Sequence, residues 1–131
     1  MNKKYLAKIF AKDNHGLKLI SACCYESKIK IIELKYLKKN QIFLVFLKRL
    51  TRENEKNIKE VNSILRFDFI EAVKSKNINQ KNKNLTLELF AINMLKNKEK
   101  FEINLLFKDN SCITLSTEIV EVILEDQKEF K

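Results

Sequence analysis

Apolar and polar residues alternate with a period of two along most of the chain. Leu65, Phe67 and Phe69, for example, alternate with Arg66 and Asp68. Successive side chains of a β-strand point to opposite faces, so each such segment predicts a strand with one apolar face on a core. We expect strands at about residues 5–11, 28–36, 42–47, 65–73, 85–94, 101–107 and 113–117. The strand at 42–47 is apolar throughout, which predicts burial on both faces.

One segment has the period of a helix instead. Four residues spaced i, i+3, i+4 and i+7 share one helical face: Leu17, Ile20, Ser21 and Cys24. Asp13 precedes this face and has a side chain suited to capping a helix N-terminus. We expect a helix from about Asn14 to Tyr25 that packs flat on the sheet.

Breaks in these periods predict the connections. The apolar phase slips between Ile31 and Ile32, which predicts a β-bulge. Residues 38–40 predict a tight turn with Asn40 at positive φ, so that the flanking strands form a hairpin. Residues 51–62 are mostly charged or polar and predict a mobile connection with room for one helical turn. Residues 75–84 predict a polar loop.

The C-terminal residues 118–130 fit two patterns. Four glutamates are spaced as on a helix: Glu118, Glu121, Glu125 and Glu129. Three apolar residues alternate as in a strand: Val120, Val122 and Leu124. We favour a strand that ends near Leu124. The predicted fold is then α+β, in a single domain of residues 1–131. It has six to eight mostly antiparallel strands, rolled or barrel-like, with one N-terminal helix packed on the sheet.

No segment has the pattern of a membrane-spanning helix or a secretion signal. The longest apolar run, Ile42–Leu47, is far shorter than the roughly 20 residues that a spanning helix needs. Lys8 and Lys12 interrupt the stretch in which a signal needs about 7–15 apolar residues. We therefore expect a cytoplasmic protein with no membrane partner.

The charge balance favours anionic partners, but composition offers a second explanation. The chain has 26 basic and 17 acidic residues, for a net charge of +9, which is typical of attraction to nucleic acid. All but three of the basic residues are Lys, and the chain has one Gly and no Pro. Because Lys, Asn and Ile have AT-rich codons, an AT-rich genome would produce the same skew. The charge is therefore either a selected binding face or a solvated surface.

Cysteine and histidine do not predict a metal site or a catalytic centre. Cys23, Cys24 and Cys112 make an odd number without C-x-x-C spacing, and we expect buried, inert thiols. His15 lies near Asp13 and could form a base–carboxylate pair. Its place at a helix start favours instead a capping Asp13 and an exposed His15. We predict no catalytic residue, no metal and no cofactor.

A group of acidic residues lies near the C-terminus. Calcium and magnesium sites need converging oxygens, usually on a tight loop that contains Gly, and no such loop is present. We therefore expect a solvated acidic face made of Glu118, Glu121, Glu125 and Asp126.

The order of several short motifs resembles a bacterial family of uncharacterised proteins, catalogued as domain of unknown function 2948. The motifs are Leu34–Leu37, Leu65–Asp68, Ala72–Lys76, Leu87–Ile92, and the acidic segments 118–121 and 124–126. The chain departs from the family at Asn77, where Gly is usual, and at the turn 108–110, which is Gly-rich in the family. Asn can replace Gly if the position is left-handed. The resemblance implies no activity, cofactor or catalytic residue.

Two sets of residues are candidates for binding. Arg66 and Asp68 point to the same side of a strand and either form a structural ion pair or hold a ligand, since guanidinium binds carboxylate or phosphate. The second set is a basic loop at 74–83 that could bind nucleic acid: Lys74, Lys76, Lys81 and Lys83. We expect a non-enzymatic binding module for a protein or small molecule. The alternatives are a weak anion- or nucleic-acid-binding domain and an enzyme of unknown type.

Overall fold

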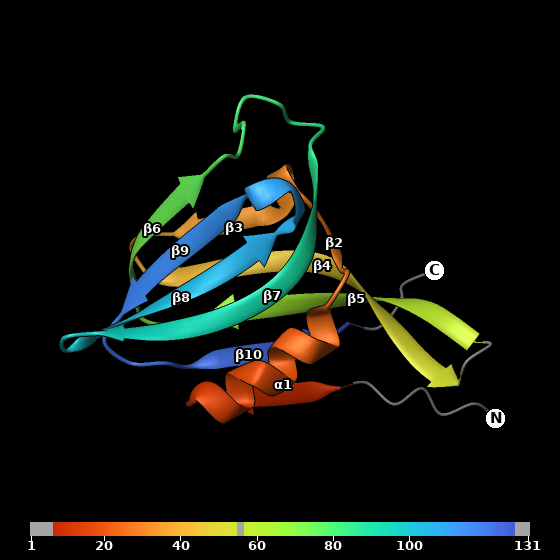
Figure 1. Ribbon diagram of the computed structural model, residues 1–131, viewed down its shortest axis with the longest axis horizontal. Coiled ribbons are helices and arrows are strands. Elements are labelled where there is room, and N and C mark those ends of the chain that lie inside the picture. Colours follow the sequence, from red (N-terminus) through yellow and green to blue (C-terminus); the bar gives the residue numbers. More distant parts are fainter. Residues whose placement is uncertain (1–6, 55–56, 128–131) are drawn as a thin grey trace.

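The computed structural model describes residues 7–54 and 57–127, which form ten β-strands and one α-helix (Figure 1). The helix α1 spans Asn14–Cys24, and two short 3₁₀ helices are η1 (Ile31–Glu33) and η2 (Lys108–Asn110). The strands are β1 (Lys8–Ala11), β2 (Lys28–Lys30), β3 (Leu34–Leu37), β4 (Ile42–Asn54), β5 (Asn57–Phe67), β6 (Ile70–Lys76), β7 (Thr86–Asn97), β8 (Lys100–Phe107), β9 (Cys112–Thr117) and β10 (Val122–Asp126).

The strands pair antiparallel and join into one curled sheet. Its order in the described part of the chain is β1-β10-β5-β4-β2-β7-β8-β9-β6, and β3 also pairs with β4. Figure 1 shows the sheet curving round, and α1 packs against β1, β4 and β7. The predicted α+β class, mostly antiparallel with one N-terminal helix on the sheet, is confirmed. The structure has ten strands, more than the six to eight predicted.

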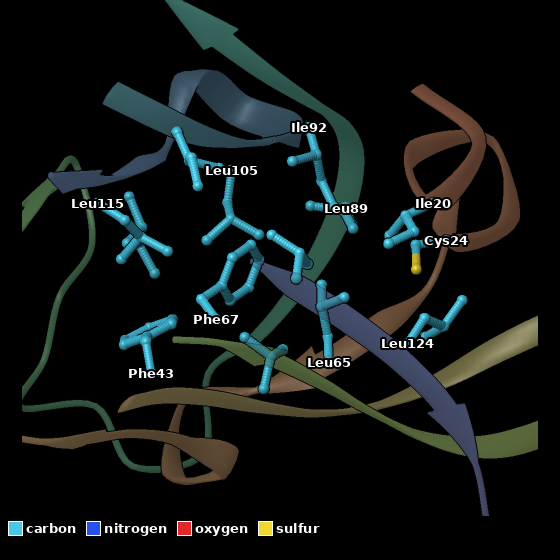
Figure 2. Packing of buried hydrophobic residues seen from close by; sticks show 14 of the residues in the cluster. Ile20, Cys24, Phe43, Leu65, Phe67, Leu89, Ile92, Leu105, Leu115 and Leu124 are labelled. Carbon is cyan, nitrogen blue, oxygen red and sulfur yellow. The ribbon is translucent and has the colours of Figure 1, made fainter. Parts of the chain in front are cut away.

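The core lies inside the curled sheet and under α1. Inward residues of adjacent strands stand opposite one another: Val45 pairs with Leu65, and Leu65 pairs with Leu124. All three are fully buried. Figure 2 shows that Ile20 and Cys24 of α1 approach the same core. Burial of one such apolar side chain contributes about 1.5–3 kcal/mol, so these alternate positions stabilise the sheet and the helix together.

The helix α1 forms where its period predicts it. Asp13 Oδ1 accepts a hydrogen bond from Gly16 N–H at 2.8 Å and caps the first turn. Gly16 allows a close approach to β1 here, because a Cβ would lie 3.0 Å from Ala11 Cα and the neighbouring backbone would have to shift. The helix ends at Cys24, one residue before the predicted end, and buries Leu17, Ile20 and Cys24.

The mobile connection predicted at residues 51–62 is wrong, because β4 and β5 extend into it as one long hairpin. Their register pairs Lys48 with Asn62 and Thr51 with Lys59. Figure 1 shows this end of the hairpin extending beyond the rest of the sheet. Strands there have no core to cover, so the apolar alternation is lost while the backbone pairing continues.

The strand predicted over 65–73 is in fact two strands. Phe69 has a φ of 60°, which no regular strand allows, so β5 ends at Phe67 and β6 begins at Ile70. The two strands have different neighbours, because β5 pairs with β4 and β10 whereas β6 pairs with β9. The corner is held by Ile70 N–H, which donates to Gln41 O at 2.7 Å.

Three smaller predictions also need correction. Residues 31–33 form the 3₁₀ helix η1 rather than a β-bulge. In the β3–β4 turn the residue with positive φ is Gln41, at 57°, and not Asn40. Only one face of residues 42–47 is fully buried, because the other face stays partly exposed at Ile42, Leu44 and Phe46.

The predicted C-terminal strand is confirmed as β10, which lies between β1 and β5 and ends at Asp126. Glu129, from the alternative helical pattern, lies outside the described residues. No helix in the described part of the chain is long and apolar enough to cross a membrane.

Candidate functional site

A pocket of about 400 Å³ opens between β3 and β6, and we call it the seam pocket. Its walls come from η1, β3, β4, β6 and β9 and from the loop 77–85, which rises at the top of Figure 1. Eight lining residues are aliphatic or aromatic: Ile31, Ile32, Leu34, Tyr36, Phe43, Val73, Ile78 and Ile113. The polar lining residues are Ser75, Gln80 and Lys83.

Two hydrogen bonds at Ile70, the first residue of β6, join this strand to the β3–β4 hairpin at one end of the seam pocket. Ile70 N–H donates to Gln41 O at 2.7 Å, and the Tyr36 hydroxyl donates to Ile70 O at 2.8 Å. The Tyr36 ring also packs beside Phe43, with ring centroids 6.5 Å apart. These contacts hold two lining side chains in place before any ligand arrives, as is usual for ligand pockets.

Asparagines shape the loop beside the seam pocket. Asn77 has a φ of 60°, which confirms that Asn stands here at a left-handed position. Its carbonyl oxygen accepts a hydrogen bond from Ser111 Oγ at 2.8 Å. The side-chain oxygens of Asn79 and Asn82 each accept the backbone N–H two residues ahead, at 3.1 and 3.2 Å. The loop therefore has an internally bonded conformation.

The four lysines predicted to bind nucleic acid are divided between a strand and a loop. Lys74 and Lys76 belong to β6, so the prediction of a loop from residue 74 is wrong at its start. Lys81 is exposed in the loop that follows, and Lys83 lines the seam pocket. Among the described residues none of the four forms an ion pair.

Arg66 and Asp68 lie on the outer side of the sheet and do not line the seam pocket. Arg66 Nε donates to Asp68 Oδ1 at 2.7 Å, and the Arg66 side chain is 47% exposed. Arg66 borders a different depression of about 410 Å³, together with Phe10 and Ile123. The predicted ion pair is therefore present, and the role of these two residues in ligand binding stays a prediction.

A buried ion pair, Arg49–Asp126, lies at the other end of the sheet. Arg49 Nε and Nη2 donate to the two oxygens of Asp126 at 2.7 and 2.6 Å. Asp126 also accepts from Ser63 Oγ at 2.6 Å and from Ala7 N–H at 2.9 Å. The predicted solvated acidic face is therefore confirmed at the exposed Glu118 and Glu125 and only in part at the half-buried Glu121. It is wrong at Asp126, which is buried.

The surroundings of this pair shift both pKa values. Burial alone would raise the pKa of Asp126, but hydrogen bonds from Arg49, Ser63 and Ala7 outweigh it and lower the pKa. The hydrogen bond to Asp126 raises the pKa of Arg49. Both groups are therefore held in their charged forms inside the fold.

A signal for this pair was present in the sequence. Arg49 continues the inward phase of Val45 and Leu47, and Asp126 continues that of Val122 and Leu124. In a strand, residues two apart share a face, so the same alternation that predicts the core also places these two charges inside it.

The three cysteines are buried or half-buried, and the histidine is exposed. Cys24 is buried as predicted, and burial raises its pKa to about 12. Cys23 and Cys112 are half-buried, so full burial is confirmed only for Cys24. His15 is exposed in the first turn of α1, and Asp13 caps that turn, as the simpler prediction had it.

These features define a small antiparallel β-domain with a solvent-open pocket of mixed apolar and polar lining between β3 and β6. The chain belongs to the family described as protein of unknown function (DUF2948), whose model matches residues 7–130. This match confirms the family predicted from the order of the motifs. No curated protein and no solved structure matches the chain.

Proposed function

We propose that this protein is a non-enzymatic binding domain and that the seam pocket holds an apolar group with an anionic end. The observation that carries the proposal is the pocket lining. It combines eight apolar side chains with one charged side chain, Lys83, among the described residues. Its volume of about 400 Å³ lies within the range of roughly 300–1,000 Å³ typical of small-ligand sites.

Lys83 is suited to fix the orientation of such a ligand. It has no carboxylate partner in the described part of the chain, so its charge is available at the pocket. The segment 72–84 contains three further lysines and no acidic residue. An anionic group beside Lys83 would therefore meet no carboxylate from this segment.

The lining supports binding rather than catalysis. Its two hydroxyl groups are already engaged, because Tyr36 donates to Ile70 O and Ser75 accepts from Gln80 at 2.8 Å. Among the described lining residues there is no Asp, Glu, His or Cys that could act as a general base. The absence of enzymatic activity and the cytoplasmic location remain predictions.

The test uses three probes with the same ten-carbon chain, each kept below its micelle-forming concentration. Decanoate, decanol and decyltrimethylammonium are titrated into the protein by calorimetry. We expect decanoate to bind with one-to-one stoichiometry, decanol more weakly and the cation most weakly. An ion pair at an exposed lysine such as Lys83 is worth about 0.2–1 kcal/mol, so Lys83→Gln should weaken decanoate binding about 1.5- to 5-fold.

Matched variants separate the pocket from general effects. Lys81→Gln removes a charge in the same loop without touching the pocket and should leave decanoate binding unchanged. Ile32→Ser should weaken decanoate and decanol alike, whereas Ile119→Ser should affect neither, although both isoleucines are more than half exposed. Equal losses from Lys83→Gln and Lys81→Gln, or no binding of decanoate, would overturn the proposal.

A second candidate function is weak nucleic-acid binding through Lys74, Lys76, Lys81 and Lys83, which have no acidic partner among the described residues. Other lysines, such as Lys28, Lys100 and Lys108, contact acidic side chains within the part of the chain that the structure describes. Replacing all four by Gln should flatten the dependence of RNA affinity on salt by several units of log–log slope. The control replaces exposed Lys38, Lys39, Lys96 and Lys98. An equal effect in the control would assign the binding to net charge alone.

A further inference from the structure

Within residues 7–54 and 57–127, the two strands that flank the seam pocket, β3 and β6, each have one unpaired edge. In the described part of the chain β6 pairs only with β9, and β3 pairs only with β4. The bond from Ile70 to Gln41 joins β6 to the hairpin at one end. Beyond it, no backbone hydrogen bond links residues 72–76 to residues 34–37. Figure 1 shows β6 at the margin of the sheet, beside β9.

A free edge of this kind can accept an additional strand. Its unpaired N–H and C=O groups form a ladder with an extended peptide, and pockets beside the edge select alternate side chains of that peptide. β6 has seven residues, which is long enough for several ladder hydrogen bonds.

The side chains of β6 divide between two environments. Val73 and Ser75 line the seam pocket, and strand geometry places Lys74 and Lys76 on the opposite face. Both lysines are exposed, and neither forms an ion pair in the described part of the chain. A strand added to β6 would alternate in the same way, with apolar side chains toward the pocket and the others beside the two lysines.

We propose that an extended peptide with alternating apolar and acidic residues adds to the free edge of β6, with its apolar side chains in the seam pocket and its acidic side chains beside Lys74 and Lys76. This inference rests on the proposed function, because it takes the seam pocket to be the binding site and names its occupant. Charge complementarity favours an acidic peptide, since residues 72–84 contain four lysines and no carboxylate.

The test measures the binding of fluorescein-labelled peptides of about eight residues by fluorescence anisotropy. The probe alternates Glu and Val. One control has the same composition in two blocks, and another alternates Lys and Val. Two further analogues of the probe are N-methylated at alternate residues, in the two possible registers. We expect binding by the alternating Glu-Val peptide and loss of binding in only one N-methylated register, because one edge of the peptide faces β6.

Reversing the charge of the two lysines on β6 provides a second test of the peptide proposal. Lys74→Glu with Lys76→Glu should weaken the Glu-Val peptide at least about tenfold and strengthen the Lys-Val peptide. The matched control is Lys96→Glu with Lys98→Glu, which changes net charge equally at exposed lysines away from the pocket. The bound probe should also displace decanoate.

Three outcomes would overturn the peptide proposal: equal binding of both N-methylated analogues, equal effects of the two charge reversals, or no peptide binding. If decanoate binding still depends on Lys83 and Ile32 in those cases, the seam pocket remains the binding site. The two lysines on β6 would then protect its edge against unwanted pairing. Failure of the decanoate test would instead remove the proposed function itself.

Discussion

Replacing either Arg49 or Asp126 alone should strongly destabilise the folded protein, because the two side chains form a buried ion pair. Their side chains are 10% and 1% exposed, so water cannot replace a lost partner. Removal of one member of a buried ion pair leaves an uncompensated charge, which costs about 3–5 kcal/mol. We expect Arg49→Met and Asp126→Leu each to lower the free energy of unfolding by this amount. For a chain of this length, at about 4 °C per kcal/mol, Tm should fall by about 12–20 °C.

The double variant should lose less than either single variant. Replacing both charges by apolar side chains removes the desolvation penalty along with the attraction. The loss that remains comes from Ser63 Oγ–H and Ala7 N–H, which no longer have Asp126 as an acceptor. Because the chain has no Trp, urea unfolding is best followed by far-UV circular dichroism. A double variant that loses the sum of the two single losses would refute the coupling. Single losses below about 1 kcal/mol would refute the burial of the pair.

The pH dependence provides a further check on the same pair. The pKa of Asp126 is lowered in the folded protein, because the hydrogen bonds it accepts outweigh the effect of burial. Its stabilising contribution is therefore present above the unfolded pKa of about 3.9, and it is lost as the pH falls through the folded value. The stability of the wild type relative to the double variant should decline below about pH 4, and a constant difference would contradict this assignment.

Three further predictions concern single residues. Ser27 Oγ is buried and has no hydrogen-bond partner in the described structure. In urea unfolding, Ser27→Ala should therefore leave the free energy of unfolding unchanged or raise it. Ser63→Ala should instead lower it by about 1.5–3 kcal/mol, because the hydrogen bond to Asp126 is lost. Cys24, with a pKa of about 12, should resist thiol reagents at pH 8 until denaturant is added, and rapid native labelling would contradict its burial. Phe69→Asn should raise the free energy of unfolding by about 0.5–1 kcal/mol by relieving a left-handed aromatic residue. The control Phe10→Asn, at an exposed position of the regularly paired β1, should give no gain.

The sequence was sufficient to predict most of the fold because the core has a strict period of two. Phe67, Leu65 and Leu124 are buried where alternation predicts them, and α1 follows its own period of 3.6. The alternation of apolar residues does not predict the outer part of the β4–β5 hairpin, because there the backbone pairing continues after the alternation has ended. It also does not predict the corner at Phe69, because nothing in the residue type of an aromatic side chain indicates positive φ.

The candidate site was only partly predictable. Lys83 was among the predicted binding residues, but its place beside η1 and β3 depends on the way the sheet closes. The seam pocket is lined by residues from 31 to 113, and no local pattern indicates which strand edges stay without a neighbouring strand. Arg66 and Asp68 pair with each other as the sequence predicts, but Asp68 follows the end of β5 and neither residue lines the seam pocket.

The most direct test of the account is an amide chemical-shift titration of the ¹⁵N-labelled protein with decanoate. We predict that the signals that move are those of residues 31–36, 73–75 and 78–83, which form the seam pocket. Signals from Phe10, Arg66 and Ile123, in the depression on the outer face, should remain in place. Shifts centred on Arg66, or shifts spread over all exposed lysines, would contradict the assignment of the seam pocket as the binding site.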